Sequence, residues 1–231
     1  MRFGPTVALI SLAATACPAA ASAQSVRDML TQAAFQDRSG SVALAKVDRA
    51  RAAAMAASQR DPDDQDAAVL AATALGYRAK LTGDRSEAMA ARRQFEIVAS
   101  RFPRNAEAQA AIGAWHLGII AHVGRFVGRA VAGARENTGL AALDRSVALG
   151  GDRAFFAGLA GMLRINFDAS DARGFQLLET AARAPTPTAL DRIIQRSVVA
   201  VLAPLRKGDR KTAKALADRL LPFGWYDDKT K

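Results

Sequence analysis

Apolar positions along this chain recur every three to four residues in one segment after another, which is the period of a helix with one buried face. The segments with this spacing span residues 41–58, 66–81, 84–102, 137–149 and 188–206, and residues 154–167 are apolar nearly all round. Glycine, proline and acidic residues fill the short breaks between them, and no segment alternates apolar and polar residues as a half-buried strand would. The pattern therefore predicts an all-α chain of about ten helices in antiparallel pairs.

Several of the predicted helices begin with residues that cap free backbone amides. An Asn, Ser, Thr or Asp side chain at this position accepts a hydrogen bond from the first turn, and an acid three residues later can complete a capping box. The expected caps are Ser25 with Asp28, Asp84 with Glu87, Asn105, and Thr188 with Asp191.

The stretch from Asn105 to Arg135 is almost free of charge and contains both histidines. A helix exposed to solvent on one side carries a polar stripe, and the stretch has none between Ala108 and Val123. Arginines at positions 125 and 129 interrupt it too early for a membrane span, which needs about 20 apolar residues. We therefore expect a buried core helix here.

The start of the chain predicts a secretory signal peptide. A basic residue precedes an apolar run from Val7 to Ala16, and the small residues Ala21-Ser22-Ala23 form a cleavage site. Removal of residues 1–23 leaves a single helical domain at 24–231 and predicts a periplasmic or secreted location. Cys17, the only cysteine, lacks the usual leucine of a lipidation motif three residues earlier, so lipidation is the less favoured alternative.

The formal net charge is +10 at pH 7, and the excess is concentrated near the end of the chain. From residue 192 to 219 there are eight basic and two acidic residues. Lys207, Arg210, Lys211 and Lys214 lie on or just before the last predicted helix, away from its apolar side. A secreted protein meets little nucleic acid, so we expect an anionic membrane surface or an acidic partner at this basic surface. An ordinary solvated helix face is the alternative.

Small residues recur at a spacing that resembles the tetratricopeptide repeat, in which they let two helices approach closely. The positions that carry this resemblance are Leu75, Gly76, Gly83 and Ala88; Ile112, Gly113 and His116; Gly174, Leu178 and Ala181; and Gly208 with Ala213. Unit starts at Val69, Ala106, Phe155 and Ile194 are 37, 49 and 39 residues apart, against about 34 in the family.

The long second interval indicates a lengthened central unit, with an insertion of about fifteen residues between His116 and Ala141. Gly124, Gly128 and Ala132 lie in this insertion at four-residue spacing. Such a small-residue face suits close helix contact, and it makes Gly124 and Gly128 candidates for contact between two copies of the chain.

The resemblance implies an α-solenoid whose first helices line a concave groove. The positions that would line it are Leu70, Thr73 and Tyr77; Glu107, Ala110 and Ala114; Phe156, Leu159 and Leu163; and Gln195, Val198 and Leu202. Most are apolar, which favours an apolar peptide, a partner helix or a lipid-like ligand. The alternative is that they are core residues, and for Trp115 we favour packing between helices over ligand contact.

The sequence contains no motif for catalysis, for a cofactor or for a metal. HExxH, GxxxxGK and GxSxG are all missing, and His116 and His122 would point about 120° apart on a helix. We therefore expect a non-enzymatic binding or scaffold protein that engages a protein or peptide partner through the apolar groove. The alternative is an accessory subunit of a transporter or envelope machine that carries a small apolar ligand.

Overall fold

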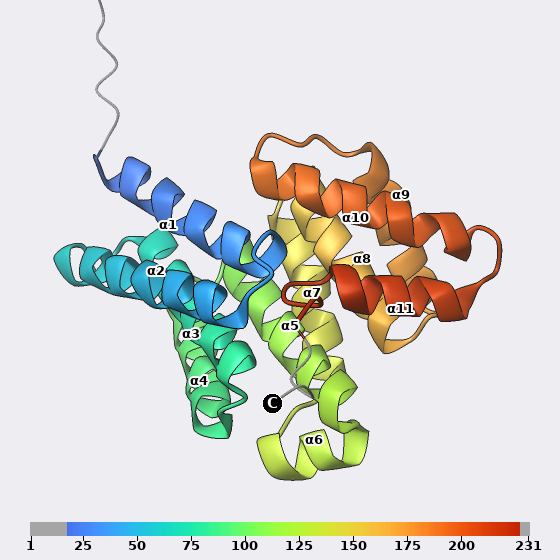
Figure 1. Cartoon of the computed structure of the whole chain (residues 1–231), viewed down its shortest axis with the longest axis horizontal. Helices are drawn as coiled ribbons and strands as arrows, with labels where there is room; N and C mark the ends of the chain where they lie inside the picture. The colour runs from blue at the N-terminus through green and yellow to red at the C-terminus, as the bar shows by residue number, and fades with distance from the viewer. Residues whose placement is uncertain (1–17, 227–231) are drawn as a thin grey trace, which may run out of the picture.

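The computed structural model describes residues 18–226, and it confirms the prediction of an all-α fold (Figure 1). This range contains eleven helices and no strand. The helices are α1 (Pro18–Phe35), α2 (Gly40–Arg60), α3 (Gln65–Thr82), α4 (Arg85–Arg101), α5 (Ala106–Val123), α6 (Arg125–Ala132), α7 (Glu136–Leu149), α8 (Ala154–Phe167), α9 (Ala172–Arg183), α10 (Ala189–Leu205) and α11 (Arg210–Leu220). Cys17 and most of the predicted signal peptide lie outside the described residues, while residues 18–23 belong to α1.

Three of the four predicted helix caps are confirmed. The Asp84 and Asn105 side chains each accept hydrogen bonds from two amides of the following turn, and Thr188 with Asp191 forms the full capping box. Ser25 is the exception, because α1 already begins at Pro18 and runs through it. The alanine-rich residues before Ser25 have high helix propensity, so the helix extends past the polar residue that was expected to start it.

Neighbouring helices pack in pairs along the chain, in a solenoid-like arrangement (Figure 1). The pairs are α1 with α2, α2 with α3, α3 with α4, α5 with α7, α8 with α9, and α10 with α11. The four predicted unit starts fall in α3, α5, α8 and α10, the first helices of four of these pairs. The short helix α6 interrupts the pair of α5 and α7, which is the lengthened central unit that the spacing predicted.

Two of the pairs cross at a glycine. A Cβ atom on Gly113 of α5 would lie 2.5 Å from Cδ2 of Leu143 on α7, and one on Gly161 of α8 would lie 2.8 Å from Cδ2 of Leu178 on α9. In each pair a leucine of the second helix therefore rests against the backbone of the first. Close approach of paired helices is the physical reason given above for the small residues that recur in the sequence.

The central apolar stretch forms two helices where one had been expected. Helix α5 ends at Val123, and Gly124 then adopts φ 84° and ψ 160°, a conformation that glycine reaches easily and other residues rarely do. His116 and Leu117 are buried as predicted, whereas His122 is exposed. The prediction of a buried core helix therefore holds for most of α5 and is wrong for the segment after it, which projects from the body as α6 (Figure 1).

The C-terminal segment from Leu221 to Tyr226 returns to the first helices of the chain. Phe223 is fully buried in a core that α1, α2 and α3 form. Its amide and the indole Nε1 of Trp225 both donate to the carbonyl of Ala34, each at 3.0 Å, and the Tyr226 hydroxyl donates to the carbonyl of Leu81 at 3.0 Å. These carbonyls lie in the last turns of α1 and α3, where no partner within the helix exists. The segment therefore caps two helices and joins the two ends of the described chain.

Candidate partner-binding surfaces

The apolar residues expected to line a groove on α8 lie in the protein core. Phe156, Leu159 and Leu163 are 4%, 7% and 7% exposed. Helix α8 packs against α5, α7, α9, α10 and α11, so nearly every side of it meets another helix. These three side chains are core residues in this structure, as the alternative interpretation of the pattern held.

Tyr77 is the predicted groove residue that the C-terminal segment covers. Its ring meets the ring of Phe223 edge-on, with 5.0 Å between the ring centroids. Burial raises the pKa of the Tyr77 hydroxyl above its usual value, and the nearby Glu107 carboxylate raises it further. Tyr77 therefore belongs to the contact between α3 and the C-terminal segment.

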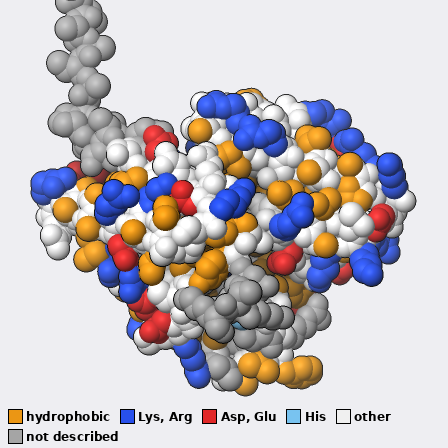
Figure 2. Space-filling model, viewed as in Figure 1, with side chains coloured by type: hydrophobic (Ala, Val, Ile, Leu, Met, Phe, Trp, Pro, Cys, Tyr) orange, Lys and Arg blue, Asp and Glu red, His pale blue; other side chains and the backbone are white. Residues whose placement is uncertain are grey.

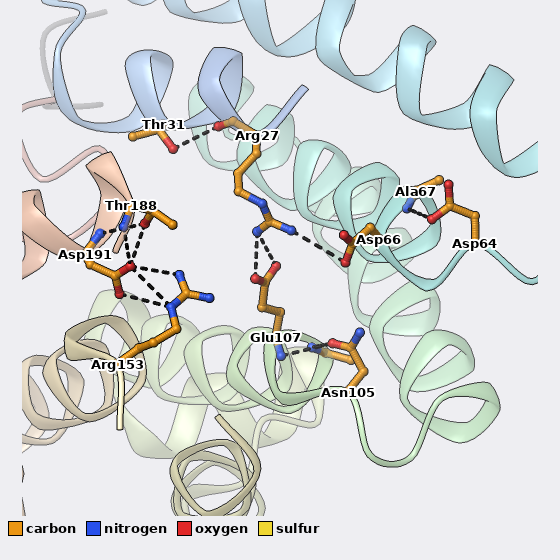
Figure 3. A network of polar contacts seen from close by, with 11 residues as sticks. Arg27, Thr31, Asp64, Asp66, Ala67, Asn105, Glu107, Arg153, Thr188 and Asp191 are labelled. Atoms are coloured by element: carbon orange, nitrogen blue, oxygen red, sulfur yellow. Dashed lines mark hydrogen bonds and ion pairs between the residues drawn. The ribbon is translucent and has the colours of Figure 1, made fainter. Parts of the chain in front are cut away.

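An ion pair that sequence reasoning missed joins α1, α3 and α5 (Figure 3). Nη1 of Arg27 lies 2.7 and 2.6 Å from the two carboxylate oxygens of Glu107, and Nη2 lies 3.7 Å from Oδ1 of Asp66. The sequence pattern placed Glu107 among the positions that would line a groove, not in an ion pair. Because Arg27 and Glu107 are 80 residues apart, no local pattern could have indicated the contact.

A second polar network anchors the start of α8 to the start of α10 (Figure 3). Asp191 is fully buried and accepts hydrogen bonds from the guanidinium of Arg153, from the amide and hydroxyl of Thr188, and from the amide of Phe155. Burial alone would raise the pKa of Asp191, but these hydrogen bonds outweigh it and lower the pKa. Helix α8 has no side-chain cap of its own, so the capping box of α10 serves both helices.

Trp115 and His116 hold the connection around α6, which agrees with the packing role favoured for Trp115. The Trp115 indole donates to the carbonyl of Ala88 at 2.9 Å, and the Arg92 guanidinium lies 5.3 Å from its ring centroid. Arg92 also donates to the Ala132 carbonyl at the end of α6 at 2.9 Å. His116 Nδ1 accepts from the amide of Arg135 at 3.1 Å, so the imidazole faces the backbone that follows α6.

Burial lowers the pKa of His116 to about 4, and the positive charges of Arg92 and Arg135 contribute to the shift. The imidazole is therefore neutral near pH 7. Only the neutral form leaves Nδ1 without a proton, so that it can accept a hydrogen bond from the Arg135 amide. The contact that holds the end of α6 thus requires an uncharged histidine.

Gly124 and Gly128 have different surroundings. Gly124 is exposed at the corner between α5 and α6, and a Cβ there would meet nothing within 4 Å. Gly128 is buried, and its carbonyl accepts from the amide of Ala134 at 3.0 Å. The two glycines therefore do not form one exposed face, and Gly128 packs within its own chain. Contact between copies through them stays a prediction.

An open hollow of about 560 Å³ lies beside α4. Among the described residues it is lined by Arg93, Glu96, Ile97, Ser100 and Arg101, all from α4. The Ile97 side chain is 57% exposed, so an apolar group of appreciable size faces the solvent there. Arg93 has no ion-pair partner among the described residues, and Arg101 pairs with Asp63 at 2.9 Å. The hollow thus combines one apolar side chain with two basic ones and with the Glu96 carboxylate, which pairs with Arg92 at 2.8 Å.

The basic residues predicted near α11 are all on the surface. Lys207, Arg210, Lys211 and Lys214 are exposed, and none forms an ion pair with another described residue. Lys214 donates to the carbonyl of Phe167 at 3.3 Å, which ties it to the end of α8. Figure 2 shows further lysine and arginine side chains across the part of the surface over α9, α10 and α11.

The described residues contain no group of three or more His, Cys, Asp or Glu side chains placed to hold a metal ion. No helix between residues 18 and 226 is both long and apolar enough to cross a membrane. The fold defines the class as an all-α protein of neighbouring helix pairs in a solenoid-like arrangement. Comparison with protein-family models, with curated proteins and with solved structures finds no match to this chain.

Proposed function

We propose that this protein is a periplasmic or secreted scaffold, built of tetratricopeptide-like helix pairs, that binds a protein or peptide partner at the hollow beside α4. The observation that carries the proposal is the exposed Ile97 inside this hollow, between Arg93 and Arg101. An apolar side chain of a partner can cover Ile97, and both side chains then lose contact with water. An acidic group beside it can pair with Arg93, whose charge is not neutralised within the described chain.

A partner protein suits this hollow better than the small apolar ligand of the alternative hypothesis. Small-molecule sites enclose roughly 70–90% of the ligand surface, whereas the described lining of this hollow comes from one face of α4. The narrow crevice between α4 and α5, lined by Phe95, Ile112 and Trp115 among others, has no space for a water molecule. A flat or convex partner surface can cover the open hollow without such enclosure.

The test is site-specific photo-crosslinking in the cells that make the protein. A photoreactive amino acid replaces Ile97, and in a matched control it replaces Val199, which is 54% exposed on α10. We expect a discrete protein adduct from position 97 that is absent at position 199 and is suppressed by a second change, Arg93→Glu. Native mass spectrometry of the purified protein then identifies what the adduct contains.

Two results would contradict the proposal. One is the same adducts from positions 97 and 199, which would indicate non-specific collision. The other is a retained small molecule, with no adduct at position 97, which would favour the ligand-carrying alternative.

A further inference from the structure

Helix α6 presents its apolar side to solvent and its small side to the protein. Successive residues of a helix are rotated by about 100°, so Phe126, Ala130 and Val127 share an arc of about 100°. Phe126 is 93% exposed, Val127 is 50% exposed, and Ala130 is exposed as well. Gly128, on the other side, is buried. An ordinary surface helix has the reverse orientation, with its apolar face on the core.

The orientation of α6 is held at its C-terminal end. Arg92 donates to the carbonyl of Ala132, the amide of Ala134 donates to the carbonyl of Gly128, and the amide of Arg135 donates to His116. Phe126 lies at the opposite end of the helix from these bonds. The apolar side chains therefore project from a fixed base, and Figure 2 shows hydrophobic side chains at the lower tip of the molecule over α6.

The sequence that includes α6 carries a positive charge. From residue 108 to residue 135 the sequence contains no aspartate or glutamate, and it has arginines at positions 125, 129 and 135. Arg129 and Arg135 are exposed. An exposed phenylalanine beside arginines on a short amphipathic helix is the combination that binds at the interface of anionic membranes, where the apolar face enters between the headgroups and the cations meet phosphate.

The size of the apolar face favours a bilayer over a protein as its occupant. A phenylalanine buries about 150–250 Å², and a stable protein interface needs about 800 Å² on each partner. With one exposed phenylalanine and one half-exposed valine, α6 falls far short of that area on its own. A bilayer needs only a shallow insertion, because attraction between the arginines and the headgroups adds to it.

We propose that α6 is an interfacial anchor that inserts Phe126 and Val127 among the headgroups of an anionic bilayer. This site is separate from the hollow beside α4, and its test does not depend on the partner proposed there. The structure places the anchor on the inserted helix, whereas the sequence had suggested the basic residues near α11 for this role.

The experiment measures binding of the whole protein to vesicles of phosphatidylglycerol and phosphatidylcholine in equal parts, with pure phosphatidylcholine vesicles as the reference. At low ionic strength we expect binding to the mixed vesicles alone. Phe126→Ala should weaken it about tenfold to a hundredfold, the range that loss of one fully buried aromatic side chain gives. Phe126→Trp should keep the binding, and its fluorescence should shift to the blue and be quenched by brominated lipids.

Matched variants separate this proposal from its competitors. Val199→Ala, which removes from α10 an apolar side chain about as exposed as Val127, should bind as the wild type does. The proposal fails if the wild-type protein ignores the mixed vesicles, or if Phe126→Ala binds them normally. It also fails if only the joint replacement of Lys207, Arg210, Lys211 and Lys214 by glutamine abolishes binding, since that result would place the membrane contact at α11. Loss of a dimer with Phe126→Ala, without loss of vesicle binding, would identify a second copy as the occupant.

Discussion

Replacement of Phe223 by alanine tests whether the return of the C-terminal segment contributes to the stability of the fold. Phe223 is fully buried among α1, α2 and α3, although 188 residues separate it from Phe35 at the end of α1. The variant keeps the backbone amide that donates to Ala34, so it removes the ring and leaves the helix cap in place. The measured change should therefore report packing alone.

The expected loss is about 3–5 kcal/mol, the range for truncation of a buried phenylalanine. Transfer of the side chain out of water accounts for about 1.5–3 kcal/mol. The cavity left behind adds about 24 cal/mol per Å³, and loss of the edge-on contact with Tyr77 adds about 0.5–1.5 kcal/mol. Total stabilities are about 5–15 kcal/mol, so a single substitution should remove a large share.

Urea unfolding followed by circular dichroism measures the change, with Phe126→Ala as the control. Phe126 is 93% exposed, so its replacement should alter the free energy of unfolding by less than about 0.5 kcal/mol. A second variant, Phe223→Gly, should be at least as stable as Phe223→Ala, because residue 223 has φ 58°, which favours glycine. Equal, small losses for Phe223→Ala and Phe126→Ala would refute the reasoning and show that the segment is dispensable.

Three further changes test helix packing, the buried network and the histidine. Gly113→Ala should destabilise the protein by about 1–3 kcal/mol through overpacking. Gly118→Ala is the control in the same helix, because a Cβ there meets nothing within 4 Å, and it should be neutral or stabilise the protein by up to about 1 kcal/mol. Urea unfolding of the two variants measures both changes. Asp191→Ala should cost about 3–5 kcal/mol in the same assay, because it leaves buried donors without their carboxylate. His116 is neutral in the folded protein with a pKa of about 4, while the ordinary value is 6.5, so the unfolded chain takes up a proton first as the pH falls between these values. Stability should then decline by up to about 1.4 kcal/mol per pH unit in that window, and unfolding at pH 7 and pH 5 should show a smaller decline for His116→Asn.

The sequence alone determined most of the helices of this protein and most of their ends. Helix period, capping residues and glycine breaks are local properties, because a helix closes its hydrogen bonds within a few residues of itself. The prediction for residues 154–167 therefore matches α8, and Asn105 and Thr188 cap the helices they were expected to cap. The 49-residue interval between Ala106 and Phe155 also indicated an insertion, and the short helix α6 lies within that interval.

Only the tertiary structure decided which faces of these helices are covered. The same apolar positions on α8 fit a groove or a core, and burial of Phe156 followed from the helices that surround α8 on nearly every side. The return of Phe223 to α1 and the ion pair of Arg27 with Glu107 depend on contacts between residues far apart in the chain, which no local pattern records. The outward face of α6 is a further case, because the direction of a helix after Gly124 depends on where the Arg92 and His116 side chains anchor its other end.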